Sequence, residues 1–193
     1  MRTVFATLLA LIIAIGGGAA SVWFLLEEAP AADGLNIGPW VAYPSLGTRD
    51  ADPYSRARFV RRGGVPMGQA EGIVFTARSD SGQQRLVSGC TYRLEGPMPV
   101  ARFWTLHAAD NSGQPLPELD GRPSGLQVSQ IQRQADNSFT IIASSRAQPG
   151  NWLAITRPGP YQLLLTLLDT PISTGAAVEE IRLPSITRVG CDV

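Results

Sequence analysis

Few residue types in this chain could carry out catalysis. It has one histidine, His107, two cysteines, Cys90 and Cys191, and sixteen basic residues, all of them arginine. A single imidazole excludes a two-histidine zinc site within one chain, and with it the metalloprotease motif. The absence of lysine excludes a Schiff base, a P-loop lysine and a lysine general base, because arginine does not deprotonate in proteins. We therefore expect no metal and no cofactor.

The remaining catalytic candidates are weak. The esterase pattern G-x-S-x-G is missing, since the serine in GRPSG (121–125) comes one place late. His107 is interpreted as a half-buried strand residue and not as a base. Glu118 and Asp120, in the polar loop 111–125, could act as paired acids or hold calcium. That loop lacks the residue spacing of an EF-hand. Because each catalytic candidate is weak, the sequence favours a protein that is not an enzyme without excluding one.

Two further features could contact a ligand or partner. The segment 54–62 carries four arginines, among them Arg58, Arg61 and Arg62, which could meet an anionic partner. Such a cluster is more often a solvated helix face, and nearby acidic residues favour that alternative. Trp152 could stack on a ligand, or it could belong to the core or its rim.

The two cysteines predict a disulfide. An even count in an extracytoplasmic domain favours a bridge, and the spacing of Cys90 and Cys191 fits no zinc motif. The alternative is two buried thiols. A bridge would close a loop of about 100 residues, worth on the order of 4 to 5 kcal/mol by the chain-entropy argument. We expect Cys90 on a strand beside residues 101–108, with Trp104 directed into the core.

The N-terminus predicts a membrane anchor. Residues 4–26 form an uncharged run of 23 residues, long enough to cross a bilayer. A cleaved signal peptide is the alternative, because small residues offer cleavage sites at 18–20 and 29–31. With Arg2 before the span and acidic residues after it, the expected location is the inner membrane, single-pass, with the C-terminal domain in the periplasm. A small-xxx-small pair, Gly17 and Ser21, is compatible with a homodimer.

The remaining chain predicts one β domain. Residues 1–26 would be the anchor, 27–38 a linker and 39–193 the domain, whose balanced charge calls for no nucleic acid. Alternation predicts a hairpin over 73–94, a strand over 101–108, a second hairpin over 126–144, a central strand over 161–168 and an edge strand within 178–189. Asp52 as N-cap and Pro53 predict a short helix before the sheet.

Several stretches resemble the bacterial domain of unknown function 1214 family. They are DPYSRA (52–57), GVPMGQAEG (64–72), CTYRLEG (90–96) with ARFWTL (101–106), and NWL (151–153) with PGPY (158–161). The resemblance covers residues 39–193 and implies a jelly-roll-like antiparallel β-sandwich. In longer proteins this domain follows a companion domain numbered 1254, and the family carries no agreed catalytic residues to transfer. A separate partner protein with the companion domain is therefore expected.

Two hypotheses of function result. The first is a membrane-anchored extracytoplasmic β-sandwich that acts as a binding or assembly module in the bacterial cell envelope. The second is an envelope hydrolase or accessory enzyme subunit that uses the carboxylates of the loop 111–125. The first is preferred, because the sequence offers few convergent catalytic groups.

Overall fold

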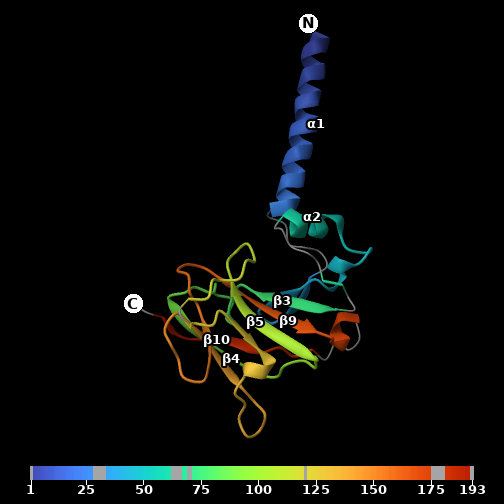
Figure 1. The fold of residues 1–193 in the computed structure, drawn as a ribbon. Coiled ribbons are helices and arrows are strands. Elements are labelled where there is room, and N and C mark those ends of the chain that lie inside the picture. Colours follow the sequence, from blue (N-terminus) through green and yellow to red (C-terminus); the bar gives the residue numbers. More distant parts are fainter. Residues whose placement is uncertain are drawn as a thin grey trace.

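The protein consists mostly of β-strands arranged in two sheets, with an apolar N-terminal helix and a second, short helix (Figure 1). The computed structural model describes residues 2–27, 34–61, 67–68, 71–119, 121–174 and 181–191. The N-terminal helix α1 stands out from the β domain, and the short helix α2 lies at its base. The two sheets pack face to face in a sandwich-like arrangement, while jelly-roll connectivity stays a prediction.

The larger sheet has six strands among the described residues, all antiparallel to their neighbours. In spatial order they are β1 (Leu35–Ile37), β2 (Trp40–Ala42), β3 (Gly72–Ala77), β9 (Gln162–Leu168), β5 (Phe103–Ala109) and β6 (Gly125–Gln127). The run YQLLLTLL indeed forms a central strand, β9, between β3 and β5. Strand β1 begins inside the predicted linker, because Gly38 adopts a positive φ of 57° and turns the chain back into β2.

The smaller sheet has four strands among the described residues. Its order is β10 (Ser185–Cys191), β4 (Cys90–Glu95), β7 (Thr140–Ser144) and β8 (Asn151–Ala154). Strands β7 and β8 run parallel, which is the one departure here from an antiparallel sandwich. Strand β10 begins directly after Pro184 and lies at the sheet edge, as the proline predicts.

Every second residue along each strand faces inward, and these side chains fill the core between the sheets. On β5, Trp104, Leu106 and Ala108 are 0–3% exposed, whereas Phe103 and His107 on the opposite face are half-buried. The other inward residues of both sheets are almost fully buried in the same cluster: Trp40, Phe75, Tyr92, Leu94, Ile141, Leu153, Leu163, Leu165, Leu167 and Ile186. Burial of this apolar surface is the main stabilising contribution to the fold.

Both predicted hairpins are wrong in their pairing. Strands β3 and β4 belong to different sheets, and residues 78–86 cross from one sheet to the other with a single bridge between Ser79 and Arg85. Strand β6 pairs with β5, while β7 pairs with β4 and β8, so residues 126–144 also span both sheets. The physical reason is that two strands on opposite sides of one core show the same alternation as two strands side by side.

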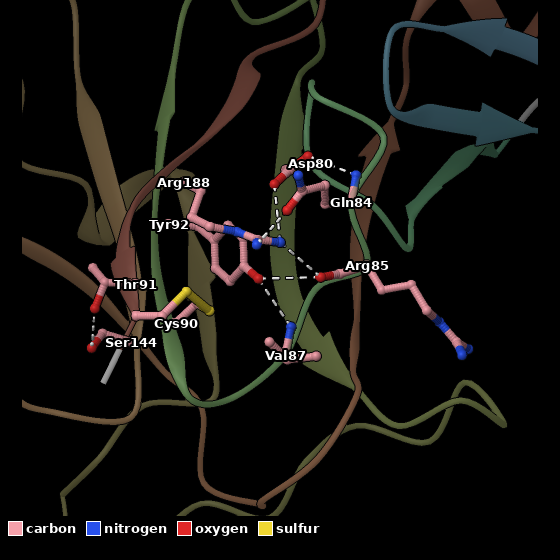
Figure 2. Close-up of a disulfide and its surroundings, with 10 residues drawn as sticks. Asp80, Gln84, Arg85, Val87, Cys90, Thr91, Tyr92, Ser144 and Arg188 are labelled. Atoms are coloured by element: carbon pink, nitrogen blue, oxygen red, sulfur yellow. Dashed lines mark hydrogen bonds and ion pairs between the residues drawn. A yellow bond between two sulfur atoms is a disulfide. The ribbon is translucent and has the colours of Figure 1, made fainter. Parts of the chain in front are cut away.

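The disulfide joins Cys90 and Cys191, which face each other directly across β4 and β10. The expectation that Cys90 would lie beside residues 101–108 is wrong, because β5 belongs to the other sheet. Next to the bridge, the Arg188 guanidinium lies 3.3 Å from Asp80 Oδ2 and donates to Gln84 Oε1 (Figure 2). These contacts and the disulfide together fix the C-terminal strand on the sandwich.

The helices match the sequence pattern. Helix α1 (Arg2–Glu27) is long and apolar enough to cross a membrane by length and composition, criteria that a signal sequence also meets. Helix α2 (Pro53–Arg61) begins after Asp52, whose Oδ2 accepts a hydrogen bond from the Ser55 amide at 2.7 Å. Three short 3₁₀ helices, η1 (Pro44–Gly47), η2 (Val128–Gln130) and η3 (Pro171–Thr174), complete the described elements.

Candidate functional site

The outer face of the six-stranded sheet is unusually apolar on the side of β2, β3 and β9. Strand register places Val41, Thr76 and Leu164 side by side in one row across this face, and Val74 in the next row. All four are half-buried. A sheet face turned toward water normally carries polar residues, so this part of the face needs a cover.

The cover is formed by the chain between β2 and β3. Four side chains lie over this face and enclose with it a groove of about 390 Å³: Tyr43 just before η1, Leu46 from η1, Phe59 from α2, and Met67. Figure 1 shows α2 on the α1 side of the β domain. The groove thus has an apolar floor on the sheet and an apolar roof on the side of the N-terminal helix.

Local interactions hold the roof in place. The Arg56 guanidinium donates a 2.9 Å hydrogen bond to the Thr48 carbonyl, which ties α2 to the end of η1. Gly47 packs directly against the carbonyl of Met67, and a Cβ at this position would overlap that carbonyl. Glycine is required here by the close approach of two backbone segments. The roof is therefore a built part of the fold.

One end of the groove is polar. Arg78, directly after β3, donates from Nε to Gln162 Oε1 at 3.0 Å. The Gln162 amide is itself held by a 2.7 Å bond from Nε2 to the Asp110 carbonyl, and the side chain is 3% exposed. Ser112 and Gln114, in the loop after β5, line the same end. The arrangement places one cation beside an otherwise apolar groove.

Arg78 is the one charged residue among the described residues that line the groove. The nearby Asp110 carboxylate is occupied by its own loop, because Oδ1 accepts from the Ser112 hydroxyl and from the amides of Ser112 and Gln114. These bonds, the Ser112 hydroxyl first, lower the pKa of Asp110, and the Arg157 guanidinium 3.4 Å from Oδ2 adds to the effect. The Asp110 carboxylate is therefore satisfied by its own loop and by Arg157.

His107 and Glu118, which no sequence motif connects, interact electrostatically in the structure. Burial lowers the pKa of His107 from 6.5, and the Glu118 carboxylate partly offsets the shift. His107 on β5 pairs with Leu164 on β9, and Leu164 separates it from Thr76 on β3. On its other side, His107 pairs with Gly125 of β6. Among the described residues it makes no side-chain hydrogen bond, and the Ser124 hydroxyl is bound to the Leu116 carbonyl at 2.7 Å. No Ser-His pair is therefore formed in that part of the chain.

The other predicted site residues do not converge. Trp152 donates from Nε1 to the Ser144 carbonyl at 2.9 Å and so braces β8 against β7. Arg61 is exposed at the end of α2, and Glu118 is exposed in its loop. The Arg58 side chain, Arg62 and Asp120 lie outside the described residues. None of the described candidates lines the groove.

The residues that form the groove were not predicted from the sequence. The run of apolar residues Ile73, Val74 and Phe75 on β3, and the continuously apolar β9, carried the signal. Both runs put apolar side chains on the two faces of the sheet, and only one face belongs to the sandwich core. Phe59 lies in the arginine-rich segment 54–62, and no sequence pattern indicated that it faces the sheet.

Comparison with protein families shows which family the chain belongs to. The family described as "Protein of unknown function (DUF1214)" matches residues 71–172, more than half of the chain. The chain belongs to this family. The matched residues of this DUF1214 protein run from the start of β3 into η3, whereas α1, η1 and α2 lie before them.

One solved structure shares the fold. The VPA0106 protein from Vibrio parahaemolyticus superposes with a TM-score of 0.61 at 18% identity, over 91% of this chain and 43% of its own. An uncharacterised protein from Burkholderia cenocepacia matches at 14% identity with a TM-score of 0.44, over 89% of this chain and 40% of its own. This DUF1214 chain thus spans less than half of either protein. No curated protein matches it.

Proposed function

We propose that this DUF1214 protein is a membrane-tethered binding module of the bacterial cell envelope, and that its groove takes a small, mainly apolar ligand. The groove carries the proposal. Its volume of about 390 Å³ falls within the roughly 300–1,000 Å³ of small-molecule sites, and its lining combines apolar walls with a few polar groups at one end. Such a lining binds by apolar burial and orients the ligand by its polar end.

The tether is supported by the surface of α1. Its large apolar side chains are exposed along the whole helix, for example Phe5, Ile12 and Ile15 at 67–70%. A helix of this kind is stable in a hydrocarbon core and unfavourable in water. The Cys90–Cys191 disulfide supports a domain on the oxidising side of that membrane. We place the helix in the inner membrane as an uncleaved, single-pass anchor with the β domain in the periplasm.

A site-specific photo-crosslinker tests the proposal. The photoreactive amino acid p-benzoylphenylalanine is introduced at Thr76, on the groove floor, and in a second variant at Val100, which is 81% exposed and outside the groove. Irradiation of cells followed by intact-protein mass spectrometry is expected to show a discrete small-molecule adduct at position 76 and none at position 100. Adding Val74→Trp, which fills the groove, should abolish that adduct, whereas Val100→Trp should leave it unchanged.

Two results would contradict the proposal. One is an adduct-free protein at both positions, and the other is an adduct at position 76 that persists after the groove is filled. Each variant is first compared with the parent protein by its urea midpoint, so that a lost adduct is not mistaken for a lost fold.

A separate partner protein that carries the companion 1254-type domain is a second proposal. It is favoured by the VPA0106 protein, whose chain extends far beyond the part that matches. Co-purification of the two full chains after co-expression would support it. Independent elution of both chains at micromolar concentration would contradict it.

The hydrolase alternative has less support. In the described part of the chain no three His, Cys, Asp or Glu side chains gather as a metal site would require. Replacing Glu118 by Ala without loss of an activity found in the purified protein would rule out the loop-carboxylate version.

A further inference from the structure

We propose that the outer face of α2 binds the surface of the bilayer that holds α1, with Tyr54 and Val60 among the lipid headgroups and Arg56 on anionic phospholipid. This surface lies outside the groove, and the inference rests on the proposed membrane anchor. Three observations carry it: the exposed apolar side chains of α2, the contact between α2 and α1, and the arginines of this segment.

Helix α2 has one face on the sheet and another that nothing in the described chain covers. Ser55 and Phe59, four residues apart, face the β domain, since Ser55 is 5% exposed and Phe59 lines the groove. Residues three apart share a helix face, which places Tyr54, Ala57 and Val60 away from the sheet. Tyr54 is 41% exposed and Val60 62% exposed, and Ala57 is exposed as well. The outer face of α2 is therefore partly apolar.

The position of α2 relative to α1 indicates what covers this face. The two helices contact each other, and Figure 1 shows α2 between the end of α1 and the two sheets. Near that end of α1, Trp23 is 59% exposed, and tryptophan is enriched at the boundary between membrane and water. With α1 across the bilayer, the side of α2 that turns away from the sheet lies toward the bilayer surface.

The charge of this segment complements an anionic surface. Residues 49–62 contain five arginines and two aspartates, a net charge of +3, and one of the aspartates, Asp52, caps α2. Arg56 is exposed and donates from Nη2 to two backbone carbonyls, and no carboxylate pairs with it among the described residues. Exposed cations beside apolar side chains are typical of helices that lie on anionic membranes. Glu27 and Glu28 offset part of this charge, so the expected preference for anionic lipid is moderate.

Fluorescence quenching by spin-labelled lipid tests the contact. Both cysteines of the chain are joined in the disulfide, so one introduced cysteine is the only free thiol. A nitrobenzoxadiazole label is attached to full-length protein in nanodiscs through Ala57→Cys on α2, Arg93→Cys on the outer face of the four-stranded sheet, or Ile12→Cys within α1. A nitroxide on the lipid headgroup should quench the label at position 57 and not at 93. A nitroxide on the acyl chain should quench the label at position 12.

Matched variants assign the contact to residues, with the label kept at position 57. In nanodiscs that contain phosphatidylglycerol, Arg56→Gln should lower the ratio of docked to undocked protein about fivefold, and Arg56→Lys should keep most of it. In pure phosphatidylcholine Arg56→Gln should have little effect, whereas a loosened α2 would lower the ratio in both lipids. Val60→Gln should lower the ratio in both lipids, and Val60→Leu should not. Arg93→Gln should change nothing, and urea midpoints show whether each variant still folds.

The outcomes separate this inference from the anchor on which it rests. A label at position 57 that is quenched no more than one at 93, while the label at 12 is quenched, would overturn the contact of α2 and leave the anchor. An unquenched label at position 12 would overturn the anchor itself. Quenching at 57 that neither Arg56→Gln nor Val60→Gln lowers would reflect only the closeness of α1, and it would also overturn the proposal.

Discussion

Replacing Trp104 by alanine tests whether the sandwich core is arranged as described. Trp104 is 3% exposed and stacks on Phe139, with ring centroids 5.7 Å apart and an interplanar angle of 24°. It comes from β5 of the six-stranded sheet, whereas Phe139 lies just before β7 of the four-stranded sheet. The pair therefore joins the two layers, and its loss leaves a cavity between them.

The expected cost follows from this burial. Truncation of a buried tryptophan destabilises a protein by about 3–5 kcal/mol, through lost burial and the cavity left behind. For a domain of this size each kcal/mol lowers the melting temperature by about 2–4 °C, so a fall of roughly 6–20 °C is expected. The aromatic pair itself should account for about 0.5–1.5 kcal/mol of the loss.

Urea denaturation of the purified full-length protein, followed by fluorescence and circular dichroism, measures the effect. The control is His107→Ala on the same strand, whose half-buried side chain faces away from the core and whose loss should change the free energy of unfolding by well under half as much. A double-mutant cycle with Phe139→Leu isolates the contact between the rings. A loss below about 1 kcal/mol for Trp104→Ala, or no coupling in the cycle, would refute the packing of the two sheets through this pair.

Three further predictions concern the disulfide, the histidine and a close backbone contact. Replacing Cys90 and Cys191 together by alanine should lower the free energy of unfolding by about 4–5 kcal/mol, because their bridge closes a separation of 101 residues, and an unchanged urea midpoint would contradict this. Because burial lowers the pKa of His107 below 6.5 in the folded state, the unfolded chain binds the proton more readily, so stability should fall as pH drops from about 7 through 6.5 toward the folded pKa. His107→Gln should flatten that part of the pH profile of urea midpoints, and identical profiles would show that the imidazole is not desolvated. Gly125→Ala should cost about 1–3 kcal/mol because its Cβ would overlap the His107 imidazole, and the loss should largely disappear in the double variant with His107→Ala.

The order of elements along the chain was largely predictable. The alternation in residues 101–108 correctly placed Trp104 in the core, and Asp52 with Pro53 correctly marked the start of α2. These features depend on residues close in sequence, through a hydrogen bond to the next turn or the side-chain period of a strand. The apolar N-terminal run was visible for the same reason.

Strand partners were not predictable from the same pattern. The alternation in residues 73–94 is equally compatible with one hairpin and with two strands on opposite sides of a core, and the structure has the second arrangement. The groove was hidden for a related reason. The sequence pattern predicts Leu164 in a central strand and Val74 in a hairpin strand, and only the chain that lies over the sheet between β2 and β3 makes them the floor of a groove.

The sequence by itself determined the two helices, most of the longer strands and their core-facing residues, and the expectation of a disulfide, whereas β1, β2 and β8 were not among the predicted strands. These properties are set by local stereochemistry and by the transfer of side chains out of water. The tertiary structure alone decided which strands pair, that Cys90 lies opposite Cys191, and that Arg78 stands at the polar end of a groove between η1, α2 and the sheet. Such placements depend on contacts between residues distant in the chain, and the period of an isolated segment does not encode them.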